Sequence, residues 1–133
     1  MPLVEWNNTF SIGVQEIDGH HRHLVELINR TSDSLVAEDS RQNLKEVFEA
    51  LLDYSVYHFS AEEKLMKETR FPGQKSHIVA HNEFARWMLE KLAMLHRGEP
   101  LTLELLTFLY DWLTEHILGL DARLGAHVHQ VSS

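Results

Sequence analysis

Residues 55–81, with the sequence SVYHFSAEEKLMKETRFPGQKSHIVAH, contain two stretches of helical periodicity joined by a short proline-glycine loop. The first stretch carries His58 and Glu62 four residues apart, and the second carries His77 and His81 at the same spacing. Side chains four residues apart on a helix stand on one face, about 6 Å from each other. A short connection between long helices predicts antiparallel packing. Each of these two helices therefore presents a pair of potential metal ligands near the loop that joins them.

The same periodicity extends over most of the chain and defines four helical segments. The expected helices lie at about residues 17–37, 41–69, 74–97 and 102–122. The breaks between them are Asp39-Ser40, Phe71-Pro72-Gly73 and Gly98-Glu99-Pro100. Residues 1–16 show no helical period and are expected to form an arm packed on the bundle, and residues 123–133 a C-terminal tail. The sequence therefore predicts a single domain over residues 1–133, an all-α, up-down-up-down antiparallel four-helix bundle.

The composition is that of one globular domain without disulfides. The 133 residues are 44% hydrophobic and 24% charged, proportions that are ordinary for a globular protein. The absence of cysteine excludes disulfide bonds, thiolate metal sites and thiol catalysis. The net charge of −8 argues against binding to nucleic acids or anionic membranes, which both require a basic face. No segment has the roughly 18–20 apolar residues that span a bilayer, and no secretory signal is evident, so we expect a cytoplasmic protein.

The chain contains ten histidines, and several of them occupy the apolar stripes expected to face the bundle core. Each expected helix places at least one strong metal ligand there, and the set is His21, His58 with Glu62, His77 with His81, and His116 with Asp121 beside it. These ligands lie alternately near the start and the end of successive helices, so antiparallel packing brings them all to one level of the bundle. A buried carboxylate without a partner costs several kcal/mol. Two carboxylates among imidazoles therefore predict a bound cation.

The type and number of these ligands indicate a site for two metal ions. Five imidazoles and two carboxylates are too many ligands for one ion and about right for two, with the carboxylates as bridges. Imidazole together with carboxylate suits iron, zinc or manganese, and the absence of cysteine agrees with that choice.

One pair of expected ligands has a spacing that a regular helix does not accommodate. His116 and Asp121 are five residues apart, which places their side chains about 140° from each other around an α-helix. Asp121 can reach the site only through a local widening such as a π-bulge, which Gly119 would ease. We therefore expect an irregularity between His116 and Asp121.

Five motifs, in chain order, carry a resemblance to a known family. They are Trp6 to Gly13, Ile17-Asp18-x-x-His21 followed by Leu-Val-x-Leu-Ile-Asn at 24–29, His58-Phe59-x-x-Glu62-Glu63-x-x-Met66, His77-x3-His81-x-x-Phe84, and Trp112-Leu113-x-x-His116-Ile117-x3-Asp121. Together they span nearly the whole chain and resemble the hemerythrins, especially the bacterial single-domain members. One departure is His20, where the family usually has glutamine before the ligand histidine. We expect His20 either to add a hydrogen bond behind the ligands or to face solvent.

The resemblance implies a non-heme centre of two iron ions. The iron with the filled coordination sphere would be bound by His77, His81 and His116. The other iron would be bound by His21 and His58. The bridges between the irons would be an oxo or hydroxo group, Glu62 and Asp121. The iron with two histidines then keeps one coordination position open for dioxygen.

The resemblance also implies a function, which is reversible dioxygen binding by a carrier that is not an enzyme. The expected role is oxygen storage, transport or delivery, with an oxygen-consuming enzyme as the partner in delivery. The residues expected to line a dry oxygen pocket are Phe59, Trp112, Leu113 and Ile117. Such a wall excludes water, which slows oxidation of the centre to an inactive diferric state.

Other function classes use similar bundles or the same centre. Ferritin-like oxidases use four carboxylates and two Glu-x-x-His pairs, whereas this chain contains no Glu-x-x-His. A di-iron redox enzyme acting on peroxide or nitric oxide is an alternative that turnover would reveal. An oxygen sensor is another, although sensors of this family are usually fused to a signalling domain, for which we expect no room here. The histidines expected at the surface or in the tail, without a role, are His23, His96, His127 and His129.

Overall fold

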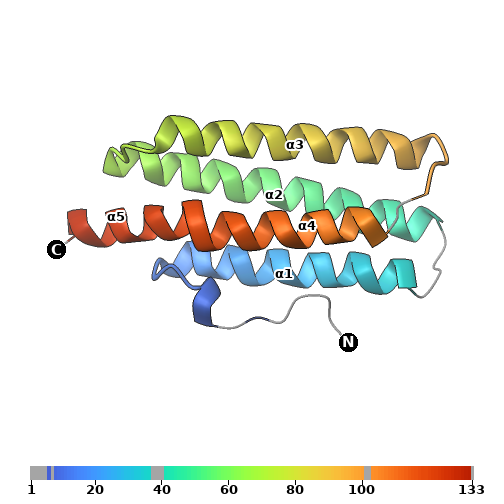
Figure 1. Ribbon diagram of the computed structural model, residues 1–133, viewed down its shortest axis with the longest axis horizontal. Coiled ribbons are helices and arrows are strands. Elements are labelled where there is room, and N and C mark those ends of the chain that lie inside the picture. The colour runs from blue at the N-terminus through green and yellow to red at the C-terminus, as the bar shows by residue number, and fades with distance from the viewer. Residues whose placement is uncertain (1–5, 7, 37–40, 101–102, 133) are drawn as a thin grey trace.

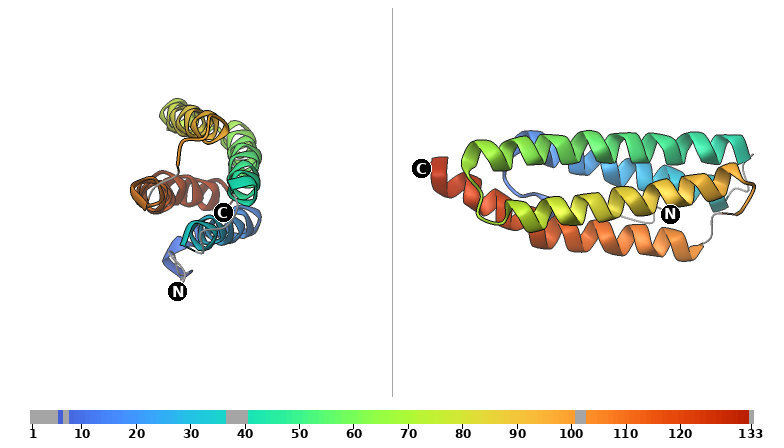
Figure 2. Two further views of the ribbon diagram at one scale, coloured as in Figure 1. Left: turned by 90° about the vertical axis from the view of Figure 1, so that its right-hand side faces the viewer. Right: turned by 90° about the horizontal axis from the view of Figure 1, so that it is seen from above.

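The computed structural model describes residues 6, 8–36, 41–100 and 103–132, and within these ranges it contains helices and no strand. The main helices are α1 (Gln15–Val36), α2 (Arg41–Thr69), α3 (Gln74–His96) and α4 (Leu103–Glu115). They run alternately in opposite directions, and the end-on view shows them arranged around a common interior (Figures 1 and 2). The predicted up-down-up-down four-helix bundle is therefore confirmed. None of the described helices has the length and apolarity needed to cross a bilayer.

The fourth helix contains the predicted irregularity. The turn after α4 is a π-helix, η2 (His116–Asp121), which begins and ends at the two ligands whose spacing a regular α-helix does not accommodate. The wider turn brings both side chains to the interior, where His116 is 5% exposed and Asp121 is 0% exposed. The prediction of a local widening is confirmed.

The prediction of a C-terminal tail over residues 123–133 was wrong. The chain continues from η2 as a further helix, α5 (Ala122–Ser132), which extends the line of α4 (Figure 1). Leu124 is fully buried, and Gly125 is buried against the arm. Polar residues are interspersed along this segment, and only a narrow apolar face of it packs on the rest of the protein. The predicted break at Asp39-Ser40 and the start of the arm at residues 1–5 lie outside the described residues.

The apolar core fills the bundle on one side of the histidine cluster. Its most buried members come from all four helices and include Ile28, Phe48, Leu51, Met88 and Leu109. They match the stripes expected from the periodicity. This apolar burial stabilises the bundle that carries the polar cluster.

Asp18, near the start of α1, holds the arm against the bundle. Its carboxylate accepts hydrogen bonds from the backbone N–H of Ile12 at 2.7 Å and of Gly13 at 3.2 Å, and from the hydroxyl of Ser11 at 2.7 Å. Gly13 has a φ of 82°, a conformation that favours glycine. The arm contains a short 3₁₀ turn, η1 (Asn8–Phe10), that ends beside the cluster.

The end of the chain is tied to the α2–α3 connection and to the arm. His127 donates a hydrogen bond from Nε2 to the carbonyl of Thr69 at 2.6 Å. Its ring also packs on Phe71 at 5.3 Å. His127, which we expected to have no role, therefore anchors α5 beside the metal-ligand end of the bundle.

We expect Gly125→Ala to destabilise the protein. A Cβ at this position would lie 2.8 Å from the Cβ of Ile12 and closer still to its carbonyl oxygen. Overpacking of this kind destabilises by about 1–3 kcal/mol. The matched control is Gly19→Ala in α1, where a Cβ would meet no atom within 4 Å. That change should stabilise the protein by about 0.5–1 kcal/mol. The measurement is thermal unfolding at equal metal content, and similar midpoints for the two variants would refute the close approach of α5 to the arm.

Candidate metal centre

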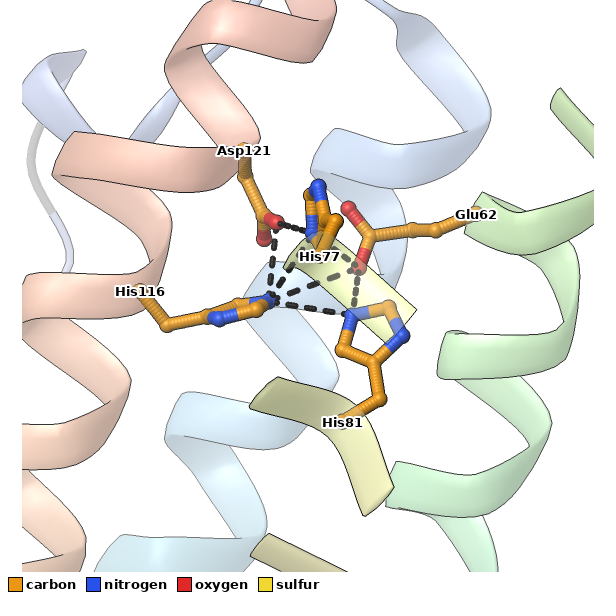
Figure 3. Close-up of side chains that lie close together, drawn as sticks. All are labelled: Glu62, His77, His81, His116 and Asp121. Atoms are coloured by element: carbon orange, nitrogen blue, oxygen red, sulfur yellow. Dashed lines mark hydrogen bonds and ion pairs between the residues drawn. The ribbon is translucent and has the colours of Figure 1, made fainter. Parts of the chain in front are cut away.

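The structure brings all seven predicted ligands to one level of the bundle, and every one of them is buried. They form two groups. Within each group, the potential ligand atoms all lie within 4.8 Å of one another. The larger group, shown in Figure 3, consists of Glu62, His77, His81, His116 and Asp121. The smaller group consists of His21, His58, Glu62 and Asp121. The two groups share both carboxylates, so the arrangement suits two ions with carboxylates between them.

The larger group has its imidazoles pointing toward a common centre (Figure 3). His116 Nε2 lies 3.3 Å from His77 Nε2 and 3.2 Å from His81 Nε2. Ring nitrogens bound to one ion at ~2.1 Å, with right angles between them, would be about 3.0 Å apart. The carboxylates complete the group, because Asp121 Oδ1 lies 2.9 Å from His116 Nε2 and Glu62 Oε1 lies 3.2 Å from His81 Nε2. These separations fit a single cation at the centre.

The smaller group approaches Asp121 from the other side and faces the same oxygen of Glu62 as the larger group. His21 Nε2 lies 2.8 Å from Asp121 Oδ2, whereas the ring nitrogens of the larger group face Oδ1. His58 Nε2 lies 3.1 Å from Glu62 Oε1. The two oxygens of Asp121 are therefore divided between the two groups, as required of a carboxylate that bridges two ions.

Several buried polar atoms of the cluster have no hydrogen-bond partner among the described residues. They include both carboxylate oxygens of Glu62 and Nε2 of His58. A buried carboxylate without a partner is strongly unfavourable in the folded state. A cation between the groups would satisfy these atoms, so the residues fit a metal site.

The far sides of three imidazoles are held by hydrogen bonds or close ring contacts. His21 Nδ1 donates to the carbonyl of Phe10 in the arm, and His81 Nδ1 donates to Glu63, each at 3.3 Å. His58 Nδ1 lies 3.0 Å from Nδ1 of His20. A neutral imidazole with its hydrogen on Nδ1 keeps a bare Nε2, which is the form that binds metal. The arm and α2 thus orient the Nε2 atoms of His21 and His81 toward the centre.

Two of these outer partners were missed by the sequence reasoning. Glu63 stands inside the quoted motif next to Glu62, so the adjacent pair of glutamates was an available signal. The carbonyl of Phe10 carries no side-chain signal, because any residue in the arm would present one.

The charges of the cluster depend strongly on one another. Burial raises the pKa of Glu62, and the neighbouring charge of Asp121 raises it further. Burial by itself would raise the pKa of Asp121, but the facing His116 lowers it well below its usual value. Burial opposes a charge on His116, yet the carboxylate of Asp121 raises the pKa of that imidazole to about 9. These shifts favour a protonated His116 facing the carboxylate of Asp121, and a cation bound by the same atoms would displace that proton.

Aromatic rings enclose the larger group. Phe59 stacks on His81 with ring centroids 4.0 Å apart, and Trp112 stacks on His116 at 4.4 Å. Leu113 and Ile117 are buried on either side of His116 in the chain. Phe59 and Trp112 thus lie on imidazoles of the larger group, and the oxygen pocket expected at the group with two imidazoles stays a prediction. His23, His96 and His129 belong to neither ligand group.

A family model described as the hemerythrin HHE cation binding domain matches residues 12–128 of this chain. The chain belongs to the hemerythrin family. The match includes all seven residues of the two ligand groups.

Individual relatives agree with the family assignment over nearly the full length. A bacteriohemerythrin of Stenotrophomonas maltophilia (strain R551-3) is 34% identical, covering 98% of this chain and 87% of the relative. A hemerythrin-like protein of Naegleria gruberi is 30% identical, covering 89% of this chain and 87% of the relative. A crystal structure of wild-type hemerythrin matches with a TM-score of 0.88 at 26% identity, covering 93% of this chain and 96% of that one.

We expect removal of the metal to lower the thermal stability of the protein. Without a cation, buried carboxylates and imidazoles face each other, and burial disfavours their charged forms. A ligand at 100 to 1,000 times its Kd stabilises the folded state by about 3–4 kcal/mol. The measurement compares unfolding midpoints before and after chelation, with amide exchange to locate loosened helix ends near the cluster. A double variant, Glu62→Ala with Asp121→Ala, removes the carboxylates that both ligand groups share; it is the control and should not respond to metal. Equal wild-type midpoints with and without metal would contradict the prediction.

Proposed function

We propose that this protein binds dioxygen reversibly at a centre of two bridged iron ions and acts as a carrier rather than an enzyme. The observation that carries the proposal is the sharing of Glu62 and Asp121 between the two ligand groups. A donor set of imidazoles and carboxylates without thiolate suits iron. The resemblance to the hemerythrins supplies the choice of iron and dioxygen.

The difference between the two groups supports a binding function. The larger group offers three imidazoles and the smaller one offers two, while both use the same carboxylates. An ion in the smaller group therefore has one protein ligand fewer and room for a small molecule. Ferrous ions bound there would supply the open coordination position and the electrons that reversible dioxygen binding requires.

The protein's own residues hold this centre and keep water from it. Asp121 and Glu62 would hold the two ions next to each other, and the outer contacts at His21 and His81 fix the imidazoles. The proposed pocket wall consists of Phe59, Trp112, Leu113 and Ile117. A dry wall protects a bound oxygen species from proton transfer and loss. The role would be storage, transport or delivery to an oxygen-consuming enzyme.

Metal analysis and reversible spectra test the proposal directly. Protein made with ample iron should contain two iron ions per chain. Its visible spectrum should change when oxygen is admitted under otherwise anaerobic conditions and return when oxygen is withdrawn. One zinc ion per chain and no iron would refute the di-iron centre. A spectrum that never returns would refute the carrier function in favour of a redox enzyme.

We expect Leu113→Ala to speed autoxidation. Leu113 is 4% exposed and lies one helical turn before His116. The change removes about three carbons from the proposed wall and leaves space through which water can approach the polar ligands. Iron content should be unchanged because no ligand is altered, while decay of the oxygenated band should become clearly faster.

The matched control is Leu109→Ala, which removes the same atoms one turn further from the cluster. Leu109 is fully buried, so this variant should lose stability but keep the wild-type autoxidation rate. Equal autoxidation of the wild type and Leu113→Ala would show that Leu113 does not guard the centre.

A further inference from the structure

His20 lies in α1 directly before the ligand His21, and it is buried although it belongs to neither ligand group. Its Nδ1 atom lies 3.0 Å from Nδ1 of His58. Its own Nε2 points the other way, 3.9 Å from a carboxylate oxygen of Glu16, which is largely exposed. His20 therefore stands between a candidate metal ligand and the protein surface, at the position where the family usually has glutamine.

The contact between the two rings has only one arrangement of hydrogens that leaves His58 able to bind metal. A neutral imidazole carries one hydrogen and one bare nitrogen. If His20 donated from Nδ1, then Nδ1 of His58 would be bare and its hydrogen would stand on Nε2, where the metal must bind. His58 must therefore donate from Nδ1, and His20 must accept. The hydrogen of His20 then lies on Nε2, on the side of Glu16.

Neighbouring rings hold His20 in the accepting orientation. The ring centroid of Tyr54 lies 5.8 Å away in an edge-on arrangement, and that of Tyr57 lies 5.2 Å away. The ring of His58 itself is nearly perpendicular to His20, at an interplanar angle of 85°. This packing limits rotation of His20 and keeps its Nδ1 directed at His58.

We propose that His20 is a positioning residue that sets the tautomer and orientation of His58 for metal binding. The proposal rests on the proposed metal centre and adds a residue that touches no metal. Glutamine at this position would offer an amide oxygen as an equivalent acceptor. His20 thus performs, with a ring nitrogen, the task that a carbonyl or carboxylate performs behind His21 and His81. Loss of such a partner typically weakens metal binding by about 10–100-fold.

Nuclear magnetic resonance of the wild-type protein tests the tautomer without any variant. The protein is loaded with Zn²⁺, which is diamagnetic, and long-range ¹H–¹⁵N spectra identify the bare nitrogen of each histidine ring. We expect a hydrogen on Nδ1 of His58 and a bare Nδ1 on His20. A hydrogen on Nδ1 of His20 would overturn the proposal.

Two variants test whether the acceptor matters for metal binding. His20→Leu fills the position with an apolar side chain that has no acceptor, and His20→Gln keeps an acceptor. Transfer of Zn²⁺ to a chelator should be about 10–100-fold faster in His20→Leu than in the wild type. His20→Gln should restore slow transfer. The control is His23→Leu, one turn along α1, because His23 packs on Tyr54 at 4.2 Å but contacts no candidate ligand. This control should behave as the wild type.

The outcomes separate the two proposals. If the wild type takes up no metal, the proposed centre itself fails. If the wild type holds metal and His20→Leu releases it at the same rate, or His20→Gln releases it as fast as His20→Leu, only the role of His20 fails. If His20→Leu does not fold, the wild-type tautomer and the transfer rate of His20→Gln still decide the question.

Discussion

The carboxylate of Asp121 is the group on which the candidate metal centre depends. It is fully buried, and its two oxygens face different sets of imidazoles, with Oδ1 toward His77 and His116 and Oδ2 toward His21. A regular helix would direct this side chain away from His116, so the π-turn η2 is a condition for the bridge. The irregularity in the fourth helix therefore also determines which charges face each other in the cluster. Irregular turns of this kind are frequent at functional sites because they re-aim a side chain without ending the helix.

Burial of seven ionisable ligands at one end of the bundle destabilises the folded state. Two other parts of the protein offset this cost. The apolar core around Phe48, Met88 and Leu109 stabilises the helices along their remaining length. At the ligand end, α5 packs on the arm through Gly125 against Ile12 and is bonded to the end of α2 through His127 and the carbonyl of Thr69. The arm also contributes to the site. Asp18 holds the arm in the position where the carbonyl of Phe10 accepts a hydrogen bond from His21. Metal binding would add to this stability because the cation satisfies atoms that otherwise lack partners.

The imidazoles of the cluster are prepared for metal before any ion is present. Hydrogen-bond acceptors behind His21 and His81 put the hydrogen of each ring on Nδ1, which leaves Nε2 bare and directed at the centre. Stacking of Phe59 on His81 limits rotation of that ring as well, and stacking of Trp112 on His116 limits rotation of one further ring. Rings that are already oriented lose little freedom on binding, so more of the metal–ligand interaction appears as affinity. The proposed role of His20 extends the same principle to His58.

The sequence by itself determined the four helices and the seven candidate ligands. The spacing of apolar residues shows the helical period, and the ligands stand out as ionisable residues on the apolar stripes that face the core. It also determined the irregularity at residues 116–121, since a spacing of five is incompatible with one face of an α-helix. Tertiary structure alone decided that residues 122–132 form α5, because the burial of Leu124 and the approach of Gly125 to Ile12 exist only once the arm and the bundle are in place. It also decided which neighbours face the Nδ1 atoms of His21, His58 and His81. His20 and His58 are 38 residues apart, and their contact exists only because α1 and α2 pack side by side. Local patterns specify helices and the faces they bury, whereas hydrogen-bond partners across helices depend on how those faces come together.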